Sequence, residues 1–250
     1  MTRNQKISLT AISLMLSAVC ILSGVMIWRE VSKRNKDKDN FNILSELAEP
    51  EKSEYTEHPV DETEAPIHKR NLTPLFEQNG DCIGWICIPG TEVDYPVMHT
   101  PDEPQRYLRQ NFYGEYSISG VPFLDGRCSL ESTNLILFGH NMKNGTMFSA
   151  VTGYADEEYA KEHPTVEFET EFGCKTYTVF ATVSVKNTDE WYGFIDAPDK
   201  EQFDEAVSAV CERAKYTTGA VPEYGKQLLT LSTCYGGNKS DRLIVIATEN

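Results

Sequence analysis

Two apolar segments close the sequence: Gln227-Leu-Leu-Thr-Leu-Ser-Thr-Cys234 and, after a polar turn, Asp241-Arg-Leu-Ile-Val-Ile-Ala247. Both are rich in β-branched and aliphatic residues, whereas residues 235–240 are typical of a turn, so the pattern predicts two strands joined by a loop. Cys234 then ends one strand, and Arg242 begins the next. A thiol at this place faces a cleft while a rigid sheet holds it, which suits a nucleophile. The alternative is a small buried thiol that merely ends a strand.

A histidine ends another apolar segment, Asn134-Leu-Ile-Leu-Phe-Gly-His140, which runs into a polar loop. Solvent reaches a histidine at a strand end, and its surroundings can tune its pKa across neutrality. The other histidines lie in linker, turn or helix-end contexts and are expected at the surface: His58, His68, His99 and His163. His140 is therefore the candidate partner of Cys234.

The residue types fit the chemistry of an amide bond. A thiol attacks only when it is ionised, and His140 can accept its proton or stabilise the thiolate as an imidazolium. Attack on a peptide carbonyl puts negative charge on its oxygen, which calls for hydrogen-bond donors. Arg242 offers two donors in a planar fork whose charge does not titrate away, and the backbone N–H of Tyr235 is a candidate for a further donor.

These strand ends resemble the sortases, the cysteine transpeptidases that attach proteins to Gram-positive cell walls. The family pattern is Thr-Leu-x-Thr-Cys on one strand, a histidine after an earlier hydrophobic strand, and an arginine on the strand after the cysteine. Here it falls on residues 230–234, on His140 and on Arg242. Further motifs resemble class B in particular: Gly84-Trp-Ile-Cys-Ile-Pro-Gly-Thr91, Asp94-Tyr-Pro-Val97, Tyr107-Leu108, Asn111-Phe112, Phe123-Leu-Asp125 and Gly139-His-Asn-Met142. The ordered set spans roughly residues 79–250 and is more specific than any single motif.

The resemblance implies a mainly β fold with peripheral helices, built on a closed eight-stranded barrel of the sortase type. It implies that Cys234, His140 and Arg242 are the catalytic residues and that no cofactor is needed. The enzyme would cut a C-terminal sorting motif of a secreted protein after threonine and hold the acyl group as a thioester. An amine of the peptidoglycan cross-bridge, or of its lipid-linked precursor, would then release it.

Residues next to this set are candidates for binding the substrate. Ser232 lies two positions before Cys234, hence on the same face of the strand, where it can bond the substrate or orient Arg242. Thr233, Tyr235 and Asn141 are the further candidates. For each of these side chains a purely structural role is the alternative.

The middle of the chain alternates short apolar runs with turn residues. The pattern predicts strands over residues 82–88, 93–98, 120–124, 134–138, 165–171, 175–185, 227–233 and 242–248. Phe172 and Gly173 are expected to form a hairpin turn, and regular short strands of this kind favour a barrel or a sandwich. Helical segments are expected over residues 101–108, 155–162 and 200–216, the last of them as a wall of the substrate groove.

The N-terminal region predicts a membrane anchor. Residues 7–28 carry no charge, and as a helix they are long enough to cross the ~30 Å hydrocarbon layer, with Trp28 as an interface anchor. A cleavable signal peptide is the alternative, but basic residues follow Trp28 without a cleavage site of small residues. We therefore expect an uncleaved transmembrane helix before the barrel.

The orientation of this anchor rests on the resemblance. Only Arg3 and Lys6 precede the span, whereas five basic residues follow it closely, and lysine and arginine favour the cytoplasmic side. Large domains can translocate regardless of flanking charge, and the resemblance implies the opposite orientation. We adopt it, with residues 1–6 as a cytoplasmic tail and the catalytic domain outside the cell membrane as a single-pass protein.

Residues 29–66 are predicted to link the anchor to a catalytic domain over residues 67–250. Their later part is acidic and carries three prolines, which indicates a solvated spacer, with an arm packed on the barrel as the alternative. The chain has a net charge of −15, and beyond residue 38 it holds 16 basic and 36 acidic side chains, a net −20. Such a surface repels phosphates, so we expect no nucleic-acid partner.

The seven cysteines do not predict a disulfide framework or a metal site. Cys20 lies in the predicted span, and a working thiol at Cys234 leaves five others, an odd number that cannot all pair. There is no Cys-x-x-Cys pair, and Cys82 with Cys87 matches no zinc framework. We expect mostly reduced core thiols.

Two other functions remain open. One is a membrane-tethered cysteine endopeptidase with the same Cys-His pair. In that enzyme water, and not an amine, would resolve the thioester. The other is a non-catalytic barrel that binds wall peptides. An added oligoglycine or diamine yields a ligated product only with a transpeptidase, and Cys234→Ala leaves a pure binding protein unchanged.

Overall fold

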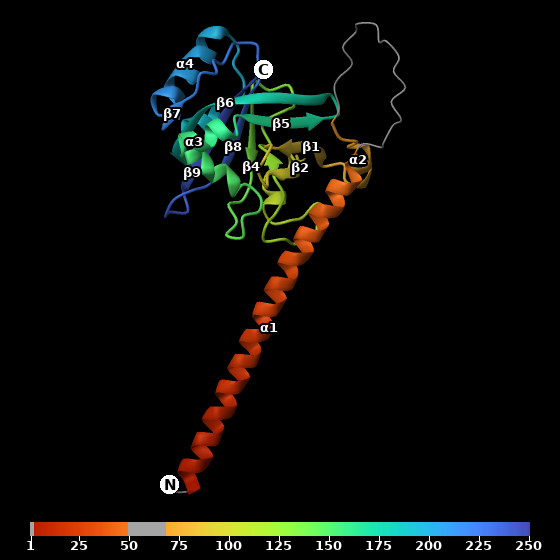
Figure 1. Cartoon of the computed structure of the whole chain (residues 1–250), viewed down its shortest axis with the longest axis vertical. Helices are drawn as coiled ribbons and strands as arrows, with labels where there is room; N and C mark the ends of the chain where they lie inside the picture. The colour runs from red at the N-terminus through yellow and green to blue at the C-terminus, as the bar shows by residue number, and fades with distance from the viewer. Residues whose placement is uncertain (1–2, 50–68) are drawn as a thin grey trace. The chain divides into compact units, whose positions relative to one another are not determined.

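The computed structural model describes residues 3–49 and 69–250 (Figure 1). The chain divides into two compact units between Asn42 and Ile43. Most of the acidic spacer expected from composition, residues 50–66, therefore lies outside the described residues. The first unit belongs to helix α1 (Arg3–Leu47). Residues 29–47 were assigned to the linker, yet they are helical, because no glycine or proline interrupts the chain from residue 25 until Pro50.

The predicted membrane span lies within α1. In the part of the chain whose side chains are described, no helix is both long enough and apolar enough to cross a bilayer. That part omits the side chains of residues 1–14, so the first third of the predicted span falls outside it. The expected transmembrane helix thus stays a prediction.

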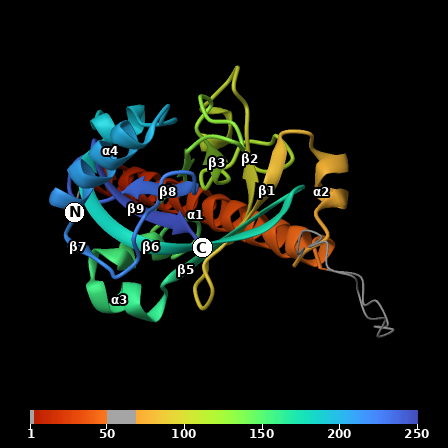
Figure 2. The same cartoon turned by 90° about the horizontal axis from the view of Figure 1, so that it is seen from above.

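The second unit is built on a closed ring of antiparallel and parallel strands (Figures 1 and 2). The strands are β1 (Cys82–Cys87), β2 (Asp94–Met98), β3 (Phe123–Leu124), β4 (Asn134–Phe138), β5 (Thr165–Thr170), β6 (Gly173–Lys186), β7 (Tyr216–Thr217), β8 (Leu228–Cys234) and β9 (Asp241–Glu249). Their order is β5-β1-β2-β3-β4-β8-β9-β6, and β6 pairs with β5 to close the ring. The predicted eight-stranded barrel is confirmed, and the two-residue β7 adds to the edge of β6.

The strands follow the expected sequence pattern closely. All eight predicted strands are present, and none of their ends moves by more than three residues. Thr170 pairs with Gly173 across the turn between β5 and β6, and Gly173 has a φ of 110°, a conformation that side chains disfavour. The predicted hairpin turn is present, but it lies one residue earlier, at Glu171 and Phe172, and Gly173 is the first residue of β6.

The helical segments lie outside the ring. They are α2 (Thr73–Gln78), η1 (Arg106–Leu108), η2 (Ala150–Ala155), α3 (Glu157–Glu162), η3 (Glu190–Gly193) and α4 (Lys200–Glu212). α4 begins where the side chain of Asp199 accepts a hydrogen bond from the backbone N–H of Gln202, and it buries Phe203 and Val210. It ends four residues before the predicted end, because Tyr216 pairs with Thr182 of β6 instead.

β8 lies between β4 and β9 in the ring and carries the site at its end. It pairs parallel with β4 on one side and antiparallel with β9 on the other. Every residue from Leu228 to Thr233 is buried, and Cys234 is the first exposed residue of the strand. A strand that is covered on both faces contains a continuous run of buried residues. In β8 this run ends at Thr233, so the thiol of Cys234 is accessible.

Candidate active site

The sheet register brings three predicted residues to one edge of the barrel. In the parallel pair Phe138 of β4 lies opposite Ser232 of β8, so His140 and Cys234 each follow two residues beyond a paired position. In the antiparallel pair Cys234 lies directly opposite Arg242 of β9. All three residues line a single cavity of about 410 Å³. Chain segments that are far apart in sequence therefore meet at this place.

The thiol of Cys234 differs from the other thiols of the barrel. Cys20 in α1 and Cys234 are the exposed cysteines among the seven, all of which are free thiols. Burial raises the pKa of Cys82 to about 12 and the pKa of Cys87 and Cys128 to about 11. Burial also raises the pKa of Cys174 to about 11 and that of Cys211 above its ordinary value. Those five thiols are held in the unreactive protonated form, and Cys234 is the accessible one.

The imidazole of His140 is oriented by a backbone carbonyl. Its Nε2 lies 3.0 Å from the oxygen of Leu108, which can only accept, so Nε2 carries the hydrogen and Nδ1 is left as the basic nitrogen. Burial lowers the pKa of His140, and the charges of Arg109 and Arg242 lower it further, against the opposing effect of the Leu108 hydrogen bond. The imidazole is therefore mainly neutral at neutral pH and able to take up a proton.

Arg242 is held by the turn that precedes it. Its Nη1 donates to the carbonyl oxygens of Lys239 and Asp241, at 2.7 Å and 2.9 Å. The guanidinium also lies near enough to His140 to lower the pKa of that imidazole. A planar cation fixed beside the thiol and the imidazole can stabilise an oxyanion.

Two of the predicted substrate-binding residues line the cavity, Ser232 and Thr233. Ser232 is 1% exposed, and its hydroxyl lies 2.8 Å from the hydroxyl of Tyr192. Its hydrogen bond thus goes to a tyrosine and not to Arg242. The hydroxyl of Thr233 donates to the carbonyl oxygen of Gly139 at 2.8 Å, which ties β8 to the end of β4.

The other two candidates, Asn141 and Tyr235, are not among the residues that line the cavity. The side-chain amide of Asn141 donates to the carbonyl oxygen of Cys234 at 3.0 Å. The backbone N–H of Tyr235, predicted as a donor to the substrate, instead donates to the carbonyl oxygen of Asp241 at 3.1 Å. This hydrogen bond continues the pairing of β8 with β9. The N–H therefore does not point into the cavity, contrary to the prediction.

Several lining residues had no signal in the sequence. Tyr192 comes from η3, and its ring stacks on Phe138 with 5.9 Å between centroids. Arg127 forms two hydrogen bonds with Asp125, at 2.9 Å and 2.7 Å, and donates to the carbonyl oxygen of Tyr192 at 2.7 Å. Among the described residues, Tyr192 of η3 borders this cavity and no residue of α4 does, so the groove wall expected for residues 200–216 stays a prediction.

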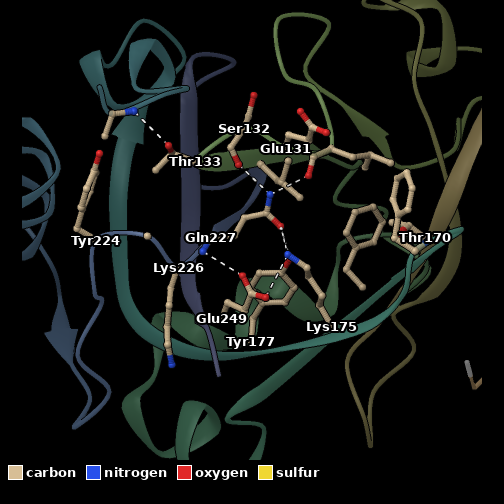
Figure 3. Close-up of a pocket in the computed structure, with 16 residues that line it drawn as sticks. Glu131, Ser132, Thr133, Thr170, Lys175, Tyr177, Tyr224, Lys226, Gln227 and Glu249 are labelled. Atoms are coloured by element: carbon tan, nitrogen blue, oxygen red, sulfur yellow. Dashed lines mark hydrogen bonds and ion pairs between the residues drawn. The ribbon is translucent and has the colours of Figure 1, made fainter. Parts of the chain in front are cut away.

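A larger cavity of about 500 Å³ lies at the opposite end of β8 (Figure 3). Gln227 at its floor is seven positions before Cys234, which along an extended strand is on the order of 20 Å. The amide of Gln227 donates to the carbonyl oxygens of Leu130 and Ser132, at 2.9 Å and 2.8 Å, and accepts from the hydroxyl of Tyr177 at 2.7 Å. These groups satisfy one another, and the cavity holds neither a cysteine nor a histidine.

The part of the chain that the structure describes contains no cluster of three or more histidine, cysteine, aspartate or glutamate side chains arranged to hold a metal. A nucleophile, a base and a cation meet in the first cavity, which suits acyl transfer through a thioester.

Comparisons with known proteins agree with this geometry. Residues 86–250 match a family model described as a Sortase domain. Sortase B of Listeria monocytogenes is 29% identical over 229 residues, which cover 90% of this chain and 88% of that protein. The structure of sortase B from B. anthracis in complex with AAEK1 has a TM-score of 0.72 at 26% identity and covers 88% of this chain and 98% of its own. A structure of sortase B complexed with triglycine has a TM-score of 0.65 at 25% identity and covers 71% and 84%.

Proposed function

The chain belongs to the sortase family of cysteine transpeptidases, as a class B member, and from that premise we propose how it acts and where. It cuts a C-terminal sorting motif of secreted proteins after threonine, forms a thioester on Cys234 and transfers the acyl group to a peptidoglycan amine. The observation that carries this proposal is the meeting of Cys234, His140 and Arg242 in one cavity at the ends of β8, β4 and β9.

The first half of the reaction forms the acyl-enzyme. Nδ1 of His140 takes the proton of the Cys234 thiol, and the sulfur attacks the carbonyl carbon of the threonine. The carbonyl oxygen becomes an oxyanion beside the guanidinium of Arg242, whose charge stabilises it. His140 then gives the proton to the leaving amine as the C–N bond breaks, and the thioester remains.

The second half of the reaction releases the acyl group from Cys234. An amine of the cross-bridge, or of its lipid-linked precursor, attacks the thioester carbonyl and passes its proton to His140. The C–S bond breaks, and the thiolate recovers the proton from the imidazolium. The existence of a sortase B structure complexed with triglycine supports a small unhindered amine as the acceptor.

The proposed location is the cell membrane, with a single N-terminal span, the tail inside and the barrel outside. Its support is the composition of residues 7–28, which are uncharged over a length sufficient for a bilayer. Such an anchor would hold the enzyme where secreted substrates emerge and where wall precursor is displayed. Protease treatment of intact cells should remove the barrel and leave the anchor, and full protection of the barrel would refute this orientation.

The transpeptidase assay uses the purified chain, a quenched fluorescent sorting peptide and triglycine. We expect a ligated product by mass spectrometry and a thioester that hydroxylamine releases. Cys234→Ala and His140→Ala should abolish both, whereas the matched control Cys211→Ala, a half-buried thiol on α4, should retain turnover. Cleavage with no ligated product at saturating triglycine would identify an endopeptidase, and peptide binding that Cys234→Ala leaves intact without any cleavage would identify a binding protein.

A further inference from the structure

The end of β8 has one edge that no strand covers. The backbone N–H of Gly139 donates to the carbonyl oxygen of Ser232 at 3.2 Å, which is the last backbone hydrogen bond between β4 and β8. Carbonyl groups two residues apart on a strand face the same neighbour, so the carbonyl of Cys234 also faces the side of β4. β4 itself ends at Phe138, and a partner from its backbone is no longer available there.

A side chain takes the place of the missing strand. The amide nitrogen of Asn141 lies 3.0 Å from the carbonyl oxygen of Cys234, so it provides the donor that β4 would have provided. On the other edge, the pairing of Cys234 with Arg242 and the hydrogen bond from Tyr235 to Asp241 hold the strand to β9. The end of β8 that carries the nucleophile is thereby fixed at both edges. At the edge towards β4 it is fixed by a single side-chain amide.

The loop that presents Asn141 is itself well fixed. The carbonyl oxygen of His140 accepts from the backbone N–H of Phe148 at 2.9 Å, and Asn141 forms a bridge with Met147. The hydroxyl of Ser149 both accepts from the backbone N–H of Met142 and donates to its carbonyl, at 2.8 Å and 2.6 Å. A further bond runs from the backbone N–H of Met147 to the hydroxyl of Tyr95 in β2, at 3.1 Å, and it ties the loop to the barrel.

We propose that Asn141 is a positioning residue, which holds the strand end of Cys234 in register with the imidazole of His140 in the same cavity. The inference rests on the proposed function of that pair. Asn141 touches the nucleophile's own carbonyl, and it is absent from the residues that line the cavity, so it acts through Cys234 and not through the substrate. A substrate-binding residue would change KM, whereas a positioning residue changes kcat.

The test compares full-length Asn141→Ala and Asn141→Asp with the full-length wild type in the triglycine assay. We expect Asn141→Ala to lower kcat about tenfold, equivalent to about 1.4 kcal/mol, with KM for the sorting peptide within about twofold. Asn141→Asp keeps the shape of the side chain but sets a carboxylate oxygen against the carbonyl oxygen of Cys234, so its kcat should fall at least as far. The matched control is Asn144→Ala, in the same loop, whose amide oxygen bonds only Thr146.

A second measurement does not depend on turnover. Hydrogen exchange over residues 233–240 should be faster in Asn141→Ala and unchanged in Asn144→Ala, because only the first change frees the end of β8. A rise in KM at constant kcat, wild-type kinetics of either Asn141 variant, or wild-type exchange over residues 233–240 would each overturn the proposal. Turnover by Cys234→Ala in the same assay would instead overturn the proposed function itself, so the two failures are distinguishable.

Discussion

The hydroxyl pair beneath the nucleophile allows a quantitative test of the site's internal bonding. Ser232 is 1% exposed and Tyr192 is 9% exposed, and their hydroxyl oxygens lie 2.8 Å apart. Tyr192→Phe removes only one oxygen and keeps the ring that stacks on Phe138. The change costs the net contribution of a hydrogen bond, about 1 kcal/mol, and leaves the Ser232 hydroxyl buried without a partner, about 1 kcal/mol more. We expect a loss of about 2 kcal/mol in the free energy of unfolding.

The reciprocal change should cost less. Ser232→Ala leaves the hydroxyl of Tyr192, which borders the open cavity and can turn towards water, so we expect a loss of about 1 kcal/mol. The double variant leaves no hydroxyl unpaired and should also lose about 1 kcal/mol, well below the sum of the single variants. The expected coupling free energy is therefore about 2 kcal/mol.

Urea unfolding of the wild type, the two single variants and the double variant measures the coupling directly. In thermal melts, the Tm of Tyr192→Phe should be lower than that of the wild type by about 4–8 °C for a domain of this size. Tyr113→Phe is the matched control, because Tyr113 is 44% exposed and should change stability by less than about 0.5 kcal/mol. If the losses of the two single variants simply add in the double variant, the hydroxyls do not interact, and this account of the cavity wall is refuted.

Two further predictions concern the end of β4. Burial holds the pKa of His140 below 6.5, so as the pH falls through about 6.5 the unfolded chain gains a proton that the folded chain does not, and stability decreases. His140→Gln should flatten this decrease in urea midpoints measured from about pH 7.5 to about pH 5.5, and an unchanged slope would contradict the lowered pKa. Gly139→Ala would set a methyl group 2.4 Å from Cγ of the buried Phe148, so we expect a loss of about 1–3 kcal/mol with a displaced His140 loop, whereas wild-type stability and turnover would contradict the tight contact.

Local pattern was sufficient for most of the strands. β8 and β9 each lie within two residues of the predicted segments at every end, because apolar, β-branched runs bounded by turn residues carry their signal in the run itself. The helical segments were less well predicted, since long-range pairing competes with local preference. Residue 216 continues a helical pattern, yet Tyr216 pairs with β6 as part of β7. The N-terminal span and the roles of the site residues stay predictions.

The principal side chains of the site were also predicted from the sequence, because Cys234, His140 and Arg242 follow the order of the sortase pattern. Their convergence depends on register. A parallel pairing of β4 with β8 and an antiparallel pairing of β8 with β9 set His140, Cys234 and Arg242 at one edge, and a shift of one residue would turn the side chain to the other face.

What surrounds these three side chains could come only from the folded chain. Every residue has a backbone carbonyl, so nothing in the sequence marks Leu108 as the acceptor for an imidazole 32 positions away. The same holds for Tyr192, which reaches Ser232 across 40 positions from a short helix without a recognisable pattern. Runs of neighbouring residues determine where strands form. The contacts that orient a catalytic group depend instead on how distant segments pack together, and that packing is a property of the whole barrel.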